Sequence, residues 1–199
     1  MSQADLDKWD VRYRNGDYLA RDYPSPFLDA WLARLPQTVF GGRALDIACG
    51  AGRNALCLAQ CDLRVDAIDI SQAALDRASA SAKDRDLKVN WIQADLDDVA
   101  LEVNAYNVIS VVRYMHRQMA TQVVDALTPD GWLIVEHHLR STQQVGGPTM
   151  STFRLAPQEL LRDYADLRVV FYEECIDEDR DGRVMALVRL VACKGDAGY

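Results

Sequence analysis

The sequence predicts an α/β fold in which a mostly parallel sheet carries helices on both faces and ends in an antiparallel hairpin. Short apolar segments alternate with segments of helical periodicity between residues 43 and 164, which is typical of a parallel sheet with crossover helices. The last two apolar segments, 167–172 and 184–191, have no helix between them and should pair directly. Hydrophobic residues make up 49% of the 199 residues, which suits one globular domain with a full core.

The first 40 residues should form a helical segment ahead of the sheet. Residues 1–24 are polar and aromatic. Ser25 followed by Pro26 is typical of a helix start. Apolar residues then recur at helical spacing until Pro36, namely Phe27, Leu28, Trp31, Leu32 and Leu35. The single domain of residues 1–199 therefore divides into an N-terminal helical or lid segment (1–40), a core (41–193) and a tail (194–199).

Seven apolar segments of the core should be strands. They cover residues 43–48, 63–70, 87–94, 106–112, 132–136, 167–172 and 184–191. Helices should cover residues 54–60, a stretch capped by Ser71, a stretch around Val123, and residues 157–164. Residues 128–131 favour a turn, and the polar loop 139–153 should be mobile.

The composition argues against several classes of partner. The chain has 30 acidic and 22 basic residues, a net charge of -8, and the resulting field repels nucleic acid and anionic membranes. No apolar run approaches the ~18–20 residues of a membrane span, and the acidic N-terminus lacks a signal core. The five cysteines form no C-x-x-C pair and should be reduced thiols. We therefore expect a cytoplasmic protein that binds neither nucleic acid nor membrane.

Ligand-binding residues should gather where the parallel strands end, because the loops at their carboxyl ends form the binding crevice of such folds. The loop after the first strand runs from Ala48 to Asn54 and contains Gly50 and Gly52. The glycines allow close backbone approach, and the following helix directs free N–H groups at the loop. On the glycines alone, a tight turn without a ligand is the alternative.

Three carboxylates at strand ends strengthen the case for a nucleotide-like ligand. Asp69 closes the second strand, where it can accept two hydrogen bonds from a ribose diol. Asp95 follows the third strand and can accept a bond from an adenine amino group. Asp46 ends the first strand, where it can orient the loop or meet a ligand ammonium group. Each acid by itself could be a solvated charge, but the three stand in register.

Together these residues resemble the class I S-adenosylmethionine-dependent methyltransferases. The pattern is D-x-x-x-G-x-G from Asp46 to Gly52, an acid that ends strand two, and Asp95 after strand three. The resemblance covers roughly residues 40–193. It implies a Rossmann-like, seven-stranded sheet with the last strand inserted antiparallel, and S-adenosylmethionine as the cofactor.

The resemblance also implies a set of cofactor contacts. It assigns Asp69 to the ribose, Asp95 to the adenine, and the two loop glycines to the methionine side. Ala48 stands where the family usually has glycine, and its methyl group would narrow the pocket or exclude a left-handed backbone. The expected cofactor-binding residues are Asp46, Ala48, Gly50, Gly52, Asn54, Asp69, Ile70, Asp95, Leu96 and Val112.

More narrowly, the chain is similar to the small-molecule branch that includes the tellurite-resistance (TehB-like) methyltransferases. Residues 9–13 (WDVRY), 113–117 (RYMHR) and 153–155 (FRL) carry this similarity. Acceptors in that branch are oxyanions or chalcogen species. Methyl transfer by in-line displacement to a small molecule, anionic or chalcogen-containing, is therefore the expected reaction, although an acceptor does not transfer with a fold.

Three side chains after strand four are candidates for catalysis. Histidine titrates near neutrality, so His116 could act as a general base or contact the acceptor. The alternative is that His116 starts a helix in solvent. Arg113 and Arg117 could hold an anionic acceptor, or they could pair with nearby acids on the surface.

Other residues should shape the acceptor pocket. Trp9, Arg12 and Tyr13 could close over the cofactor as a lid, or pack on the edge of the sheet. Tyr114 and His137 could enter the pocket. Because adjacent strand residues point to opposite faces, His137 and its neighbour should not share a metal ion, and we expect no metal. Residues 177–182 resemble half of a calcium loop but favour a hairpin turn.

Two other functions remain open from the sequence. Residues 50–55 also satisfy G-x-G-x-x-A, and Asp69 lies about 20 residues on, as in NAD-binding oxidoreductases. That reading leaves Asp46 and Asp95 without a role. A degenerate methyltransferase fold that binds the cofactor without turnover is the second alternative, and the oligomeric state is open.

Overall fold

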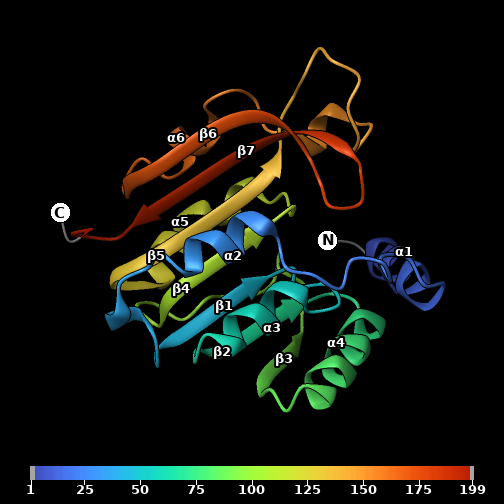
Figure 1. The fold of residues 1–199 in the computed structure, drawn as a ribbon, viewed down its shortest axis with the longest axis horizontal. Helices are drawn as coiled ribbons and strands as arrows, with labels where there is room; N and C mark the ends of the chain where they lie inside the picture. Colours follow the sequence, from blue (N-terminus) through green and yellow to red (C-terminus); the bar gives the residue numbers. More distant parts are fainter. Residues whose placement is uncertain (1–2, 198–199) are drawn as a thin grey trace.

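The computed structural model describes residues 3–197, so the ends of the predicted N-terminal segment (1–2) and tail (198–199) lie outside the described residues. Its centre is a seven-stranded sheet (Figure 1). The strands are β1 (Arg43–Ile47), β2 (Arg64–Asp69), β3 (Val89–Gln93), β4 (Tyr106–Val112), β5 (Leu127–His138), β6 (Arg168–Glu178) and β7 (Val184–Cys193). The α-helices are α1 (Gln3–Arg14), α2 (Pro26–Leu32), α3 (Arg53–Gln60), α4 (Gln72–Asp84), α5 (Ala120–Ala126) and α6 (Glu159–Asp163). Short 3-10 helices are η1 (Gln37–Val39), η2 (Arg117–Met119) and η3 (Ser151–Phe153).

The strand order is β3-β2-β1-β4-β5-β7-β6. The first five strands are parallel, and β7 enters antiparallel between β5 and β6. This confirms the predicted fold class, including the terminal hairpin. The classical dinucleotide-binding order is 3-2-1-4-5-6, so the inserted β7 removes the topological support for the NAD-binding alternative.

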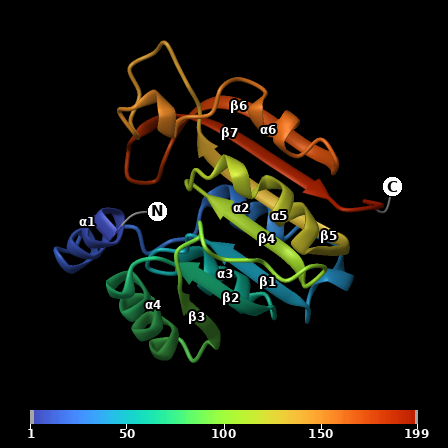
Figure 2. The same ribbon diagram turned by 180° about the vertical axis from the view of Figure 1, so that it is seen from behind.

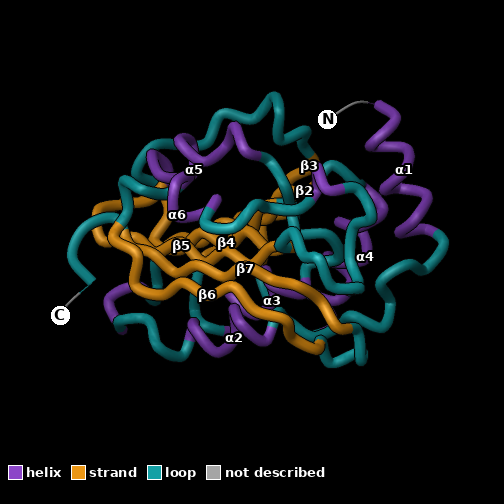
Figure 3. Tube along the Cα trace, turned by 90° about the horizontal axis from the view of Figure 1, so that it is seen from above, coloured by secondary structure: helices purple, strands orange, loops and turns teal. Residues whose placement is uncertain are grey.

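Helices cover both faces of the sheet, as predicted. Viewed along the sheet, α2 and α3 lie on one side and α5 and α6 on the other (Figure 3). Figure 2 shows the second face, where α5 runs beside β4 and β5. Each face buries its own apolar cluster, and the two clusters share no residue.

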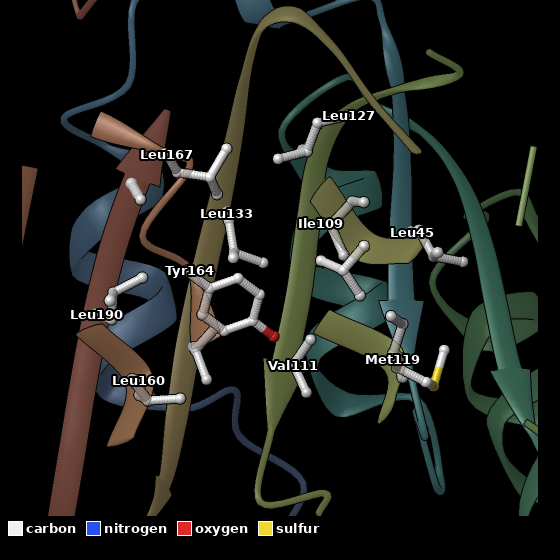
Figure 4. Packing of buried hydrophobic residues seen from close by; sticks show 14 of the residues in the cluster. Leu45, Ile109, Val111, Met119, Leu127, Leu133, Leu160, Tyr164, Leu167 and Leu190 are labelled. Atoms are coloured by element: carbon white, nitrogen blue, oxygen red, sulfur yellow. The ribbon is translucent and has the colours of Figure 1, made fainter. Parts of the chain in front are cut away.

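The cluster under α5 and α6 draws side chains from β1, β4, β5 and β7 (Figure 4). Leu133 and Ile109 are fully buried on the sheet, while Met119 and Leu160 close it from the helical side. Tyr164 crosses β5, and its hydroxyl is directed toward Val111. Burial of apolar surface of this kind stabilises the folded state by about 25 cal/mol per Å² and is the main stabilising contribution to the fold.

The N-terminal segment is helical, as predicted, and contacts both α4 and the turn between β6 and β7. Helix α1 lies at the β3 edge of the molecule beside α4 (Figure 1). Ser25 caps α2, because its hydroxyl accepts the N–H of Leu28 at 3.5 Å. Between them, Arg21 pairs with Asp181 at 3.6 Å, so the segment also touches the turn between β6 and β7.

The predicted turn at residues 128–131 is part of β5, which begins at Leu127. The backbone N–H of Asp130 donates to Lys194 O at 2.6 Å, and Lys194 N–H donates to Gly131 O at 2.9 Å. These bonds carry strand pairing through the irregular residues, where Asp130 has φ +63°. The residues that predict a turn therefore form a local distortion of β5, and backbone hydrogen bonds to Lys194 keep them in the sheet.

The polar loop 139–153 is held more firmly than the sequence predicts. The guanidinium of Arg154 donates to three backbone carbonyls, those of Pro148, Leu139 and Gly146, at 2.8–3.1 Å. One arginine thus ties both ends and the middle of the loop together. Arginine's rigid fork of donors suits this role.

Two further expectations can be compared with the structure. All five cysteines are free thiols, as predicted. The acidic segment after β6 forms a hairpin turn, in which Gly182 N–H donates to Asp179 O at 2.8 Å. Within residues 3–197, no helix has both the length and the apolar character needed to span a membrane.

Candidate active site

The loop after β1 adopts left-handed backbone at several positions. Gly50 has φ +55°, and a Cβ built there would lie 2.3 Å from the hydroxyl of Tyr13, so a larger residue would strain the backbone and displace the Tyr13 side chain. Ala48 has φ +54°. The expectation that its methyl group would exclude a left-handed backbone is therefore wrong, because the surrounding loop imposes that conformation on alanine at a strain cost of about 1–2 kcal/mol.

Two residues of the predicted cofactor set have packing roles here. Gly52 has φ +80°, and a Cβ there would lie 2.6 Å from Trp91 and 2.8 Å from Ala78. Glycine is thus required at this position, because the start of α3 packs closely against β3 and α4. Asn54 is buried, and its Oδ1 accepts the backbone N–H of Ser25 at 2.9 Å, which joins α3 to α2.

Asp46 is 1% exposed at the end of β1. Its Oδ1 accepts the hydroxyl of Ser110 at 2.6 Å, while its Oδ2 is buried and has no hydrogen-bond partner among the described residues. Burial raises the pKa of Asp46 to about 7, although the Ser110 hydroxyl, nearby Arg53 and the backbone N–H of Ala55 lower it. A buried carboxylate oxygen without a donor marks a place where a cationic group would be stabilised.

Asp69 is buried at the end of β2 and organises two loops. Its Oδ2 accepts the N–H of Gly50 at 2.7 Å, and its Oδ1 accepts the N–H of Ser71 at 2.9 Å. Burial raises the pKa of Asp69, while these backbone hydrogen bonds lower it. The carboxylate therefore joins the loop after β1 to the start of α4, and both loops depend on it.

The remaining predicted cofactor residues also lie at strand ends. Asp95 stands two residues after β3 and accepts the N–H of Asp97 at 2.9 Å. Leu96 is 1% exposed, and its side chain belongs to the core under α5. Ile70 and Val112 are buried directly after β2 and at the end of β4. The structure thus places the whole predicted set along one edge of the sheet.

The lid candidates lie on α1, beside the loop after β1. Tyr13 fills the space in front of Gly50, and burial with Asp69 nearby raises the pKa of its phenol. Trp9 lies under the guanidinium of Arg12, whose carbon is 5.2 Å from the ring centroid. Helix α1 is anchored by Asp10, a residue that the sequence analysis passed over.

The anchor is a cap on α4. Asp10 Oδ1 accepts the hydroxyl of Ser71 at 2.6 Å and the N–H of Ala73 at 3.2 Å. Asp10 is 6% exposed, and Arg14 pairs with it at 2.8 Å. An acid at a helix N-terminus is stabilised by free N–H groups. The aspartate within the WDVRY stretch was the available signal for this contact.

The two candidate arginines are engaged with acids of the protein. Arg113, with φ +60°, pairs with Asp179 at 3.0 Å and lies 3.6 Å from Glu136. Arg117 pairs with Glu159 and also donates to the Thr152 carbonyl. Both arginines pair with acids, as in the alternative given by the sequence, but the Arg113 pair is buried rather than on the surface, and Arg117 lines the small cavity described below.

Buried charges beneath the β6–β7 hairpin are the largest group missed by sequence reasoning. Glu136, 1% exposed, accepts from Ser25 at 3.2 Å and from Arg189 at 3.0 Å. A lone acid in the apolar strand β5 was the available signal. Arg53 was also missed; its only hydrogen bond among the described residues is to Tyr23 O at 3.3 Å, and burial and nearby Arg113 lower its pKa.

A small cavity of about 30 Å³ lies on the α5 face, between the ends of β1, β4 and β5 and helix α6. Three residues that line it each have a buried polar atom without a hydrogen-bond partner among the described residues: Tyr114 Oη, His116 Nδ1 and His137 Nε2. Burial lowers the pKa of His137 to about 4, so its ring is neutral at pH 7. Unsatisfied polar atoms that converge on one space indicate a missing partner there.

A larger hollow of about 710 Å³ lies elsewhere, between α4 and the first residues of β1, β2 and β3. It is open to solvent and lined by both polar and apolar side chains. Because parallel sheets bind ligands at the carboxyl ends of their strands, we place the functional site at the smaller cavity and the loop after β1.

Comparison with known proteins finds a family whose model matches part of the chain. Residues 44–131 match a family described as a methyltransferase domain, a span that includes β1–β4 and the loops that hold Asp46, Asp69 and Asp95. The ubiquinone biosynthesis O-methyltransferase of Rickettsia akari is 28% identical over 96 residues, which is 46% of this chain and 38% of that protein. The Rickettsia felis enzyme of the same name is 30% identical over 96 residues, 46% and 39% of the two chains. The chain thus spans about two fifths of the length of these relatives.

Solved structures share the fold over most of the chain. TehB from Haemophilus influenzae superposes with a TM-score of 0.71 and 20% identity, covering 89% of this chain and 66% of that one. A structure reported for conversion of a disulfide bond into a thioacetal group during echinomycin biosynthesis gives 0.74 and 16%, with 96% and 92% covered. An S-adenosylmethionine-dependent methyltransferase of Aquifex aeolicus gives 0.66 and 16%, with 98% and 99% covered.

Proposed function

We propose, from the membership of residues 44–131 in the methyltransferase-domain family, that this protein transfers a methyl group from S-adenosylmethionine to a small-molecule acceptor. Class I methyltransferases share this sheet and take S-adenosylmethionine as their cofactor. The observation that carries the proposal is the buried Oδ2 of Asp46, which has no donor among the described residues and stands beside the glycine loop.

The residues at the strand ends fit this cofactor. The unsatisfied oxygen of Asp46 suits the ammonium group of the methionine end. Arg53 has no carboxylate partner among the described residues, so it is available to the carboxylate of the same end. Asp69 suits the ribose hydroxyls and Asp95 the adenine, since each is a hydrogen-bond acceptor at the end of a neighbouring strand.

When bound, the cofactor supplies a methyl group on a sulfonium, already activated for in-line displacement. The protein has to hold the acceptor in line with it and exclude water, which can lower the barrier by about 7–11 kcal/mol. Helix α1 supports exclusion of water, because Asp10 fixes it on α4 and Tyr13 covers the glycine loop. Opening and closing of this lid would govern access.

The acceptor is proposed to be a neutral molecule with a hydroxyl group. Arg113 and Arg117 are both paired with carboxylates, which weakens the case for an anionic acceptor. The cavity beside His137 has an apolar wall with a few polar atoms, a composition typical of small-molecule pockets. The relatives named O-methyltransferases are consistent with oxygen as the methylated atom.

Calorimetric titration of S-adenosylhomocysteine tests the cofactor site. Asp69→Asn should weaken binding by more than tenfold, because each lost bond to a charged acceptor is worth roughly 1.5–3 kcal/mol. Asp76→Asn, an exposed aspartate on α4, is the matched control and should stay within twofold of the parent. Absence of binding to the parent protein at millimolar ligand would contradict the proposed function, whereas binding without turnover across hydroxyl acceptors would favour the degenerate module.

A further inference from the structure

We propose that Asp97 and His116 form a base dyad for this reaction, in which Asp97 positions the imidazole and His116 Nδ1 takes the proton of a hydroxyl acceptor. The inference rests on the proposed function and adds to it the atom that acts, the residue that orients it and the class of acceptor. Asp97 is a positioning residue, because it contacts the imidazole and not the cavity.

The geometry of the pair supports this assignment. His116 Nε2 lies 2.6 Å from Asp97 Oδ1. The carboxylate side chain is 48% exposed, whereas the imidazole is 17% exposed and turns its other nitrogen inward. That nitrogen, Nδ1, is buried without a hydrogen-bond partner among the described residues, and His116 is one of the residues that line the cavity. The ring thus joins a solvent-facing carboxylate to an interior space.

The hydrogen bond to Asp97 determines which nitrogen is basic. An ionised carboxylate only accepts hydrogen bonds, so Nε2 must carry the proton in the neutral ring. Nδ1 then keeps its lone pair and can accept a proton. This is the arrangement of a base oriented by an acid, in which the acid also stabilises the imidazolium that forms.

The other groups around the cavity do not compete for this role. His137 is the second imidazole in the wall, but it has no carboxylate partner within residues 3–197, and its pKa is lowered to about 4 by burial. Burial and the nearby acids Asp97 and Asp95 raise the pKa of the Tyr114 phenol, so it stays protonated and can donate a hydrogen bond. The remaining titratable groups that face His116 are Arg117, Asp163 and Tyr164. Arg117 is neutralised by Glu159.

The cavity also restricts the acceptor. Its volume of about 30 Å³ accepts one water molecule or one hydroxyl group, not a whole substrate. Met115, Met119 and Leu160 line it, so the group that carries the hydroxyl should be apolar. An alcohol or phenol fits both conditions. An oxyanion would have no proton to give to Nδ1 and would lie against an apolar wall.

The step balances without another reactant. The O–H proton moves to His116 Nδ1, and the oxygen pair that it leaves forms the new O–CH₃ bond. The pair of the broken C–S bond stays on sulfur, which becomes a neutral thioether. The imidazolium beside Asp97 then returns its proton to solvent. A base of this kind contributes about 10²–10⁴-fold to the rate.

Nitrogen NMR of the histidine rings tests the dyad without knowing the natural acceptor. The chain has three histidines, so three ring patterns are expected, and loss of one pattern in His116→Gln assigns that ring. At pH 8 the parent should show the Nε2–H tautomer at His116. Asp97→Asn should allow the Nδ1–H tautomer to appear, while Asp98→Asn, an exposed neighbour without contact to His116, should leave the pattern unchanged.

Phenol is the probe for the acceptor role, since a purely structural histidine would not respond to it. Added to the protein saturated with S-adenosylhomocysteine, phenol should shift His116 Nδ1, and Asp97→Asn should reduce that shift at least threefold. A dominant Nδ1–H tautomer in the parent, or no shift at millimolar phenol, overturns the dyad. Calorimetry on the same samples separates the two proposals, because loss of the dyad leaves S-adenosylhomocysteine binding intact.

Discussion

Replacing Asp46 by asparagine should make the free protein more stable, relative to the parent, at alkaline pH than at acidic pH. The same change should weaken binding of the cofactor. The reason is the burial of this carboxyl group: its pKa is raised from 3.8 to about 7 in the folded state. Between these values the unfolded chain has lost the proton that the folded chain keeps. The folded state therefore loses stability as pH rises through this window.

The magnitude follows from the pKa shift. Each pH unit between the two pKa values changes the free energy of unfolding by about 1.4 kcal/mol. From pH 5 to pH 7 the parent should thus lose about 2 kcal/mol of stability from this group, and by pH 8 a total that approaches about 3 kcal/mol. Asparagine does not titrate. Any constant effect of the amide on the Ser110 hydrogen bond cancels when the same pair is compared at both pH values.

Urea unfolding followed by circular dichroism, at pH 5 and pH 8, gives this difference of differences. The free energy of unfolding of Asp46→Asn, relative to that of the parent, should be about 3 kcal/mol higher at pH 8 than at pH 5. The exposed control Asp76→Asn should show no such change. At pH 7.5 the variant should bind S-adenosylhomocysteine at least tenfold more weakly. An equal stability difference at both pH values would refute the reasoning, because it would mean that Asp46 is already ionised in the folded protein.

Two further predictions concern packing near the site. Gly52→Ala should lower the free energy of unfolding by about 1–3 kcal/mol more than Gly41→Ala in urea titrations, because both glycines have φ +80° but only Gly52 faces Trp91 and Ala78. Equal losses would show that backbone strain alone sets the cost. Asp10→Ala should release α1 from α4 and raise the rate of trypsin cleavage after Arg14 about tenfold, given a loss of roughly 1.5–3 kcal/mol. The control variant Asp7→Ala, at an exposed position, should be cleaved at the rate of the parent. Cleavage of Asp10→Ala at the parent rate would show that the cap does not hold the helix.

Most of the fold was predictable because it follows from local periodicity and from general rules of chain connection. Short apolar segments located every strand. The last two strands, with no helix between them, had to pair antiparallel. The turn signal at residues 128–131 failed, since its distortion is compensated by backbone bonds to Lys194, which is distant in sequence. Strand boundaries of this kind depend on the partner strand.

The acids of the candidate site were predictable for a similar reason. Asp46, Asp69 and Asp95 follow successive parallel strands, and the carboxyl ends of such strands meet at one edge of the sheet. The partners of the arginines were not predictable in this way. Arg113 pairs with Asp179, 66 residues away, and Arg117 with Glu159, 42 residues away. Their sequence neighbours contain no sign of these contacts.

The sequence by itself determined the sheet, the glycine loop and the row of acids, because backbone geometry and burial periodicity act over a few residues. Only the tertiary structure decided how each charged or titratable group is used. It buried Asp46 with one oxygen unsatisfied, neutralised Arg113 with Asp179, and set Asp97 against His116 across 19 residues. The physical reason is that desolvation and ion pairing depend on distances in space, which a chain acquires only when its loops come together.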